Sequence, residues 1–549
     1  MQDVLSNPFF ELSVILAIAA LLGAIGLMLR QPLIVMFIAL GILVGPSFLN
    51  LVSSSDMVHL LAELGIALLL FVVGLKLDLS LIRSTGMIAL MTGLGQVIFT
   101  SVFGYLIGIA LGYDSITALY IAIALTFSST IIIVKLLSDK KEIDSLHGQI
   151  AIGFLIVQDI VVVLLMIMLS AMNAKTGAHP VLGILQVVVT GSAIVAVIGL
   201  LMRFVIPSLV HYLARSQELL VLFSIAWAVI VASACDYLNF SREVGAFLAG
   251  VSLASTPYRE MISGRLVSLR DFLLLFFFIN LGAQLNLGLL GEQIGPSILF
   301  SVFVLVGNPL IVVAIMGIMG YRKRTSFLAG LTVAQISEFS LIFAALGLNM
   351  GHIQESTVGL ITLVGLITIG LSTYMIIYSH RLYDVLTPVL SIFERKRPYR
   401  ESEAEQSMPQ QVDVILFGLG RYGGNIALTL LKDNIHLLCI DFDPQQVRYW
   451  QKQGLSALYG DVEDPELPDR LPLSSAKYVI SSLSDVNANI ALVKQLRSSG
   501  YTGVIALTAH RQPDAERLHA SEADVILSPF VDAAETIPAR LHMAEKIKG

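Results

Sequence analysis

Thirteen apolar stretches, most of them about 20 residues or longer and the ninth and tenth shorter, occupy the first part of this 549-residue chain. A helix of about 20 apolar residues crosses the hydrocarbon core of a bilayer, where it bonds its own backbone groups. The pattern therefore predicts a multi-span α-helical membrane protein of about thirteen transmembrane helices. The stretches lie at residues 8–28, 32–51, 57–76, 85–112, 115–137, 147–171, 181–206, 216–236, 243–256, 267–284, 292–320, 325–349 and 356–384.

Charged residues divide the chain into two parts. Residues 1–380 contain 34 Lys, Arg, Asp and Glu residues, whereas the remaining 169 residues contain 40. The second part has the charge content of an ordinary soluble domain. Between the apolar stretches and this domain lies a polar segment with three prolines. We therefore expect a transmembrane domain at 1–386, a linker at 387–410 and a soluble domain at 411–549.

The basic residues of the first part predict its orientation. Fourteen of them fall at alternate connections between the apolar stretches, and the other connections hold only Lys175 and Arg242. Because cytoplasmic loops carry an excess of Lys and Arg, the N-terminus is expected outside and the soluble domain in the cytoplasm. The fourteen are Arg30, Lys76, Arg83, Lys135, Lys140, Lys141, Arg203, Arg215, Arg259, Arg265, Arg270, Arg322, Lys323 and Arg324.

Bulk charge and cysteine content speak against several classes of protein. A net charge of -6 does not favour nucleic-acid binding, which needs a basic surface. The two cysteines, Cys235 and Cys439, lie far apart and have no metal-ligand spacing around them. We therefore expect neither a structural disulfide nor a zinc site. The N-terminus lacks the basic start and the cleavage site of a signal peptide, so the first stretch is expected to be a retained helix.

Polar clusters interrupt the fifth and the twelfth apolar stretches. Two stretches that are seven apart cross the membrane in opposite directions, so we predict inverted repeats with crossing broken helices. In transporters of this architecture the freed backbone groups form the ion site. The alternative is that the small hydroxyl residues only pack helices closely or bond to the preceding turn. The clusters are Thr126, Phe127, Ser128, Ser129 and Thr130 in the fifth stretch, and Gln335, Ile336, Ser337 and Glu338 in the twelfth.

Two carboxylates lie within predicted spans. Asp159 is far from both ends of the sixth stretch, where a charge costs at least ~2.5–3.5 kcal/mol on insertion scales. It can hold either a proton or an alkali cation, and the preceding Gln158 offers an amide oxygen or a donor. The alternative is an aspartate neutralised by a buried basic partner. For Glu338 we favour stabilisation of the positive end of a half-helix over direct cation binding.

The soluble part alternates short apolar strands with helical patterns, which predicts a parallel α/β sheet of Rossmann type. Gly418, Gly420 and Gly423 follow the first strand and open a helix, and Asp441 ends the next strand. This pattern is typical of a nucleotide site, in which the glycines approach a phosphate and the acid binds ribose hydroxyls. Asp461 ends a later strand at the same edge. The alternative is a Rossmann fold whose site is empty or vestigial.

These features together resemble the Kef-type potassium/proton antiporters of the monovalent cation:proton antiporter-2 family. The resemblance rests on the mid-membrane QD at 158–159, the two polar crossing segments and the GLGRYG motif. It extends to LLFVVGLKLDL in the third stretch and GAFLAGVSLASTPYR in the ninth, and so covers nearly the whole chain.

The resemblance implies a homodimer in a bacterial inner membrane that exchanges ions by an elevator-like motion, with an ancillary regulatory subunit as a further partner. Asp159 would bind K⁺ (or Na⁺) and H⁺ in turn. The attached domain resembles the N-domain of regulators of potassium conductance (RCK/KTN), which implies AMP or NAD(H) as a regulatory nucleotide. The implied ion-site residues are Gln158, Thr126, Ser128, Gln335 and Glu338, and the implied nucleotide contacts are Gly418, Gly420, Arg421, Tyr422, Asp441 and Asp461.

The chain departs from its relatives in two respects. Electrogenic members have two adjacent aspartates and a lysine in a later span, whereas this chain has Gln158 and Asn308. One titrating group per site predicts electroneutral one-for-one exchange. The glutathione-gated members have an acidic loop after the ninth span, where this chain has YREMISGRLVSLRD. Glutathione gating is therefore not expected.

Two other classes of protein share parts of this pattern. An RCK-regulated potassium channel would need a selectivity filter of the TVGYG kind, and no such segment occurs. A membrane enzyme linked to NAD would need a hydride-acceptor site, which the sequence does not indicate, so we do not expect an enzyme. The choice between K⁺ and Na⁺ stays open, because the same oxygen atoms bind both cations.

Overall fold

The computed structural model describes residues 8–45, 55–75, 79–173, 196–238, 242–283, 287–395, 411–535 and 537–538. It forms two compact units, which we describe separately. The membrane unit comprises residues 1–140, 150–315 and 327–387. The Rossmann unit comprises residues 388–549 together with two short segments, 141–149 and 316–326.

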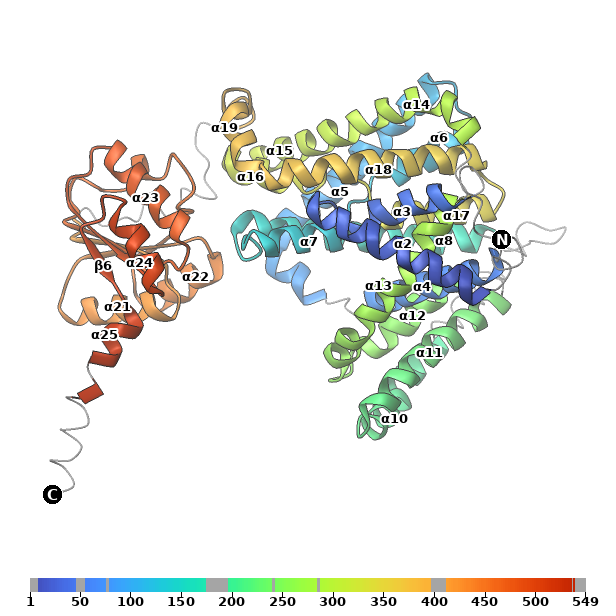
Figure 1. Ribbon diagram of the computed structural model, residues 1–549, viewed down its shortest axis with the longest axis horizontal. Helices are drawn as coiled ribbons and strands as arrows, with labels where there is room; N and C mark the ends of the chain where they lie inside the picture. Colours follow the sequence, from blue (N-terminus) through green and yellow to red (C-terminus); the bar gives the residue numbers. More distant parts are fainter. Residues whose placement is uncertain are drawn as a thin grey trace. The chain divides into compact units, whose positions relative to one another are not determined.

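Apolar helices make up the membrane unit (Figure 1). Within the described residues, eight are long and apolar enough to span a bilayer, and a ninth candidate is the pair 196–204 and 206–213, bent by 50°. Each predicted stretch contains a helix where it is described, although 181–195 lies outside the described residues; the count of thirteen stays a prediction. Apart from the half-helices of two spans described below, the helices are α2 (Pro8–Met28), α3 (Leu33–Val44), α4 (Ser55–Leu75), α5 (Leu79–Ala110), α8 (Leu146–Asn173), α10 (Ile206–Leu213), α11 (Gln217–Tyr237), α12 (Arg242–Ala254), α13 (Arg259–Ala283), α14 (Leu287–Val302), α15 (Asn308–Ile318), α18 (Glu355–Ile377) and α19 (Ser379–Leu390).

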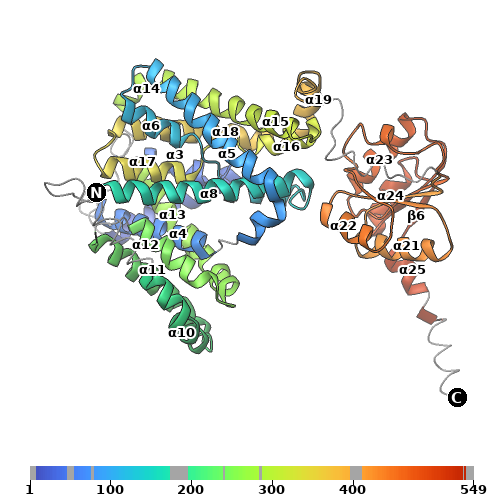
Figure 2. The ribbon, with the colours of Figure 1, turned by 180° about the vertical axis from the view of Figure 1, so that it is seen from behind.

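Glycines let one group of these helices pack backbone to backbone. A Cβ atom at Gly250 of α12 would collide with the backbone of α4 at Phe71. The same holds for Gly282 of α13 against Ile38 of α3. Such close approach is how helices associate in lipid, where burial of apolar surface gives little driving force. The group of α3, α4, α12 and α13 can be followed in Figures 1 and 2, where α5, α6, α14 and α18 form a second group.

Two spans are broken where the sequence predicts. The fifth consists of α6 (Ser115–Ala124) and α7 (Thr130–Asp139), and the twelfth of α16 (Lys323–Leu331) and α17 (Glu338–Asn349). The hydroxyl residues explain the restart of each helix, because Ser129 is the N-cap of α7 and Ser337 is the N-cap of α17. The half-helices α6 and α17 pack together, with the rings of Tyr120 and Phe343 5.0 Å apart. The prediction of broken helices is confirmed.

The Rossmann unit contains the predicted parallel sheet. Its strand order is β3-β2-β1-β4-β5-β6, so the order reverses between β1 and β4. Ligands of such sheets bind at this reversal, outside the carboxyl ends of the strands. The strands are β1 (Val414–Phe417), β2 (Leu437–Asp441), β3 (Ala457–Tyr459), β4 (Tyr478–Ser481), β5 (Val504–Thr508) and β6 (Val525–Leu527), and the helices are α21 (Arg421–Lys432), α22 (Pro444–Lys452), α23 (Val486–Ser498), α24 (Gln512–His519) and α25 (Pro529–Glu535).

The helix α19 continues beyond residue 386, the predicted end of the transmembrane domain. The sequence predicts a linker from residue 387, but α19 continues through Pro388 to Leu390. Leu390 is buried, which favours the additional helical residues over a solvated linker. Residues 396–410 of the predicted linker lie outside the described residues.

Candidate functional site

Asp159 lies in the middle of α8 and meets the start of α7. The hydroxyl of Thr130, the first residue of α7, donates a hydrogen bond of 2.9 Å to Asp159 Oδ2. Among the described residues, Asp159 forms no ion pair, and its Oδ1 accepts no hydrogen bond. This disfavours the alternative of an aspartate neutralised by a basic neighbour. A carboxylate oxygen is therefore free to bind a cation or a proton.

Gln158 lies beside Asp159, but its amide faces the break in the fifth span. Its Oε1 accepts the backbone N–H of Ser128 at 3.1 Å, and its Nε2 donates to Oε1 of Gln96 at 2.7 Å. Both polar atoms of Gln158 are thus engaged with protein groups. The geometry favours a role in holding the break over a role as cation ligand.

The other polar residues of the fifth span have distinct partners. Thr126 donates to the carbonyl of Ala122 at 2.9 Å and lies 3.2 Å from the hydroxyl of Ser101. Ser129 caps α7 by accepting the N–H of Ile132. The hydroxyl of Ser128 is buried and has no hydrogen-bond partner in the described part of the chain. Ser128 therefore has an unused oxygen of the kind that binds alkali cations.

The twelfth span contributes the second carboxylate. Glu338 is buried and is the first residue of α17, so its charge lies at the positive end of that half-helix. Its Oε2 lies 3.5 Å from the hydroxyl of the preceding Ser337. Ser337 caps α17, and Gln335 accepts a hydrogen bond of 2.7 Å from Ser372 of α18. The geometry of Glu338 favours the predicted stabilising role.

Sequence reasoning left out three residues that the structure brings into this region. Thr130, which bonds Asp159, belongs to the polar cluster of the fifth stretch but was not expected in the site. Gln96 and Thr100 of α5 were also not expected. Their sequence signal is weak: with Thr92 they recur every fourth residue, and all three are fully buried. A polar stripe on one face of an apolar helix is the pattern that would have found them.

Two of the three glycines after β1 are required by the local geometry, and the third faces open space. Gly418 has a φ of 86°, a conformation that residues with a Cβ rarely adopt. A Cβ at Gly423 would collide with the carbonyl oxygen of Gly418 and with Ser482. At Gly420, the N-cap of α21, no atom lies within 4 Å of the position that a Cβ would take. The open space at a helix N-terminus is where a phosphate binds.

Asp441 and the first residues of α21 border this loop. The Asp441 carboxylate accepts the backbone N–H groups of Leu419 and Asp443. Burial raises the pKa of the Asp441 carboxyl above its ordinary value, although the two N–H groups lower that pKa in part. Arg421 and Tyr422 form the first turn of α21, and burial raises the pKa of the Tyr422 phenol. These residues lie where the sequence predicts a nucleotide site.

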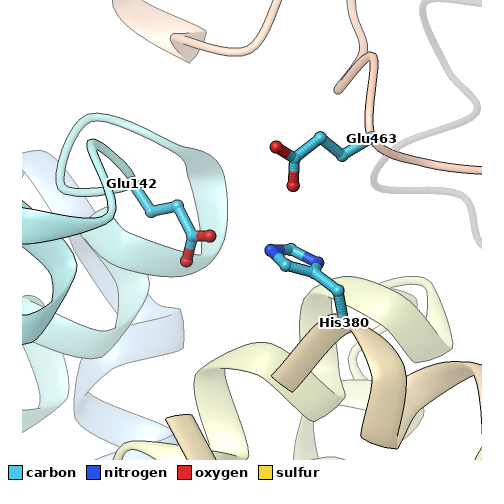
Figure 3. Close-up of side chains that lie close together, drawn as sticks. All are labelled: Glu142, His380 and Glu463. Carbon is cyan, nitrogen blue, oxygen red and sulfur yellow. The ribbon is translucent and has the colours of Figure 1, made fainter. Parts of the chain in front are cut away.

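Asp461 has a partner that the sequence did not indicate. Its Oδ2 accepts a hydrogen bond of 2.8 Å from Arg324, which belongs to the Rossmann unit through the segment 316–326. Its Oδ1 accepts the backbone N–H of Glu463, whose side chain is labelled in Figure 3, at 3.0 Å. Burial alone would raise the pKa of the Asp461 carboxyl, but Arg324 holds that pKa below the ordinary value. The predicted contact of Asp461 with a nucleotide stays a prediction.

Comparison with known proteins identifies the membrane part of the chain. The transmembrane domain of sodium/hydrogen exchangers matches residues 14–377, which is more than half of the chain. The chain belongs to the sodium/hydrogen exchanger family. Residues 414–529 of this exchanger match the TrkA-N domain.

Three curated relatives are similar to this exchanger over more than half of its length. The putative cation/proton antiporter YbaL of Escherichia coli is 26% identical over 95% of this chain and 95% of the relative. The glutathione-regulated potassium-efflux system protein KefC of Cronobacter sakazakii is 26% identical over 90% of this chain and 78% of its own length. The K(+) efflux antiporter 6 of Arabidopsis thaliana is 30% identical over 63% of this chain and 59% of the relative. The predicted resemblance is confirmed.

We predict that the exchanger tolerates alanine at Gly420 but not at Gly423. Gly423→Ala forces α21 away from the loop after β1 and should lower the unfolding free energy of the Rossmann unit by about 1–3 kcal/mol. Gly420→Ala meets no atom and should leave the unfolding temperature unchanged. Thermal unfolding of the two purified variants compares them directly. Equal unfolding temperatures would contradict the assigned packing.

Proposed function

We propose that the protein is a secondary active transporter that exchanges K⁺ for H⁺ across the membrane, and not an enzyme. The observation that carries the proposal is Asp159, a carboxylate within a predicted span with no ion pair among the described residues. A charged group in such a position is retained for transport far more often than for packing. Its placement beside a broken helix is that of ion sites in transporters with inverted repeats.

The chemistry of one carboxylate supports exchange. A proton on Asp159 removes the negative charge that attracts a cation, and a bound cation occupies the oxygen that would take the proton. The two ligands therefore exclude each other. Oδ1 of Asp159 and the hydroxyl of Ser128, neither of which has a hydrogen-bond partner among the described residues, are oxygen ligands suited to K⁺ or Na⁺.

The cation is proposed from the names of the relatives, two of which are described as potassium-efflux or K⁺-efflux proteins. An Na⁺/H⁺ antiporter of the same fold is the first alternative, because the same oxygens serve both ions. An RCK-regulated potassium channel is the alternative of another class, and the missing TVGYG segment speaks against it.

Two neutral amides at the break of the fifth span support electroneutral exchange. At the position where electrogenic relatives have a lysine, Asn308 is fully buried and accepts a hydrogen bond of 2.6 Å from Thr100. Gln158 takes the place of the first of the two adjacent aspartates. Neither amide titrates, so one proton is expected to move for each cation.

Regulation is proposed to act through the Rossmann unit. The open space at Gly420 and the carboxylate of Asp441 support binding of AMP or NAD(H) at the end of β1. We also propose a homodimer in a bacterial inner membrane, with the N-terminus outside, the Rossmann unit in the cytoplasm and an ancillary regulatory subunit as a further partner. These proposals rest on the basic-residue pattern and on the family resemblance.

We predict that Asp159→Asn abolishes exchange, because an amide neither releases a proton nor neutralises a cation. Cation-induced dequenching of a pH-sensitive dye in proteoliposomes measures the rate, with K⁺ and Na⁺ compared in the wild type. The control is Asp114→Asn at the N-cap of α6, where asparagine is an equally good cap. Wild-type activity in Asp159→Asn would overturn the assignment, and a response to Na⁺ alone would replace K⁺ by Na⁺.

Electroneutral exchange is predicted to be independent of membrane potential. A potential imposed with an ionophore across proteoliposomes without a proton gradient should drive no current through the protein. The same vesicles should still exchange cations for protons when a gradient is applied. A potential-driven current that persists without the proton gradient would contradict one-for-one exchange.

Nucleotide binding is predicted to depend on Gly420. Calorimetric titration of the full-length protein with AMP and with NAD(H) should show binding to the wild type. Gly420→Ala should weaken that binding at least about tenfold, because its methyl group fills the space of a phosphate. Absence of binding of either nucleotide to the wild type would remove this mode of regulation.

A further inference from the structure

A buried polar stripe on α5 contains none of the residues proposed above to bind the cation or the proton. It consists of Thr92, Gln96 and Thr100, which are fully buried and recur at every fourth residue. Residues at this spacing lie on one face of a helix. Gly93 places this part of α5 against α8, because a Cβ there would lie 3.0 Å from Val157. The stripe thus lies in the same part of the membrane unit as Gln158.

Gln96 bonds two other segments of the membrane unit directly and a third through Thr100. Its Oε1 accepts from Gln158 of α8 at 2.7 Å. Its Nε2 donates to the carbonyl of Thr126 in the break of the fifth span at 3.1 Å, and to Thr100 at 3.0 Å. The Thr100 hydroxyl then donates to Oδ1 of Asn308 at 2.6 Å.

These hydrogen bonds form a continuous network that begins at the backbone N–H of Ser128 and ends at the carbonyl of Leu125. The two backbone groups fix which atom donates and which accepts in every bond of the network. At one end Ser128 supplies an N–H, so Gln158 must present its oxygen there and its NH₂ group to Gln96. Gln96 must then present its own NH₂ group to Thr126 and Thr100. At the other end Nδ2 of Asn308 faces the carbonyl of Leu125 at 3.4 Å. An amide turned the other way would place two donors or two acceptors face to face.

Three amides therefore serve three backbone groups that the break sets free. Gln158 bonds the N–H of Ser128, Gln96 bonds the carbonyl of Thr126, and Asn308 approaches the carbonyl of Leu125. Asn308 directly follows a five-residue π-helical segment, Phe303–Gly307, a feature that often marks functional positions in helices. Gln96 is the central member, because it bonds a backbone group and Gln158 of α8 directly, and is linked to Asn308 of α15 through Thr100.

We propose that Gln96 is a positioning residue for cation exchange. It keeps the break of the fifth span in the conformation in which α7 starts at Thr130 and the Thr130 hydroxyl meets Asp159. A site held in its binding geometry before the cation arrives loses no free energy to ordering when the cation binds. The inference rests on the proposed function, and it adds a residue of α5 that contacts neither the cation nor the proton.

Gln96→Leu should raise the half-saturating cation concentration about tenfold, because the break is no longer held before binding. The matched control is Gln293→Leu on α14. Gln293 accepts a hydrogen bond of 2.7 Å from Tyr113 and is not bonded to Gln96, Gln158, Thr100 or Asn308. Initial rates in proteoliposomes at a series of K⁺ concentrations give the half-saturating concentration and the maximum rate. A purely structural role would lower the maximum rate, through less folded protein, without moving the half-saturating concentration.

A double-mutant cycle tests whether Gln96 acts through Gln158. Gln96→Leu, Gln158→Leu and the double variant should raise the half-saturating concentration by similar factors, since all three remove the hydrogen bond between Gln96 and Gln158. If Gln96→Leu does not fold, the nearly isosteric Thr100→Val replaces it, with an expected rise of about threefold. An unchanged half-saturating concentration in Gln96→Leu or in its Thr100→Val replacement, or multiplicative effects in the cycle, would overturn the proposal.

The wild-type response to K⁺ and Na⁺ tests the proposed exchange separately from the role of Gln96. If the wild type responds to Na⁺ and not to K⁺, the same series is measured with Na⁺. If neither cation drives proton movement, the proposed exchange fails, and the cation-induced rise in the unfolding temperature of the purified protein becomes the readout for Gln96. An equal rise in Gln96→Leu and Gln293→Leu would then count against positioning.

Discussion

A helix broken inside the bilayer leaves backbone groups without partners, and the membrane unit is arranged around this constraint. Each unsatisfied group costs several kcal/mol in hydrocarbon. In the fifth span, side-chain amides from α5, α8 and α15 face the freed groups of Leu125, Thr126 and Ser128. The same break creates the free start of α7, where Thr130 bonds Asp159. The contacts that satisfy the backbone therefore also build the site.

The sequence predicts those features that depend on local pattern. Apolar length predicts the spans, and hydroxyl clusters predict the two breaks because Ser129 and Ser337 are natural helix caps. In the Rossmann unit, a glycine pattern between a strand and a helix predicts the loop, since Gly418 and Gly423 answer steric needs that only glycine meets. Each of these predictions depends only on residues that are close together along the chain.

The features that could not be predicted depend on partners far apart along the chain. Thr100 and Asn308 are separated by 208 residues, and Arg324 and Asp461 by 137. The spacing of Gln96 and its neighbouring threonines indicates a polar face on α5, but it does not indicate which distant residues that face contacts. The direction of the Gln158 amide is set by the backbone of Ser128, which only the folded chain brings to it.

The neutrality of the amides gives a physical reason for tight coupling in the proposed exchange. Asp159 carries an uncompensated negative charge when the site is empty, and that charge is costly inside a bilayer. A proton or a monovalent cation cancels it, so the two loaded states have the same net charge and the empty state has one more negative charge. The family resemblance implies a lysine in electrogenic members where this chain has Asn308, and an amide adds no positive charge to offset the negative charge of the empty site. We therefore expect movement of the empty site to stay unfavourable, so that a cation carried one way is exchanged for a proton carried the other way.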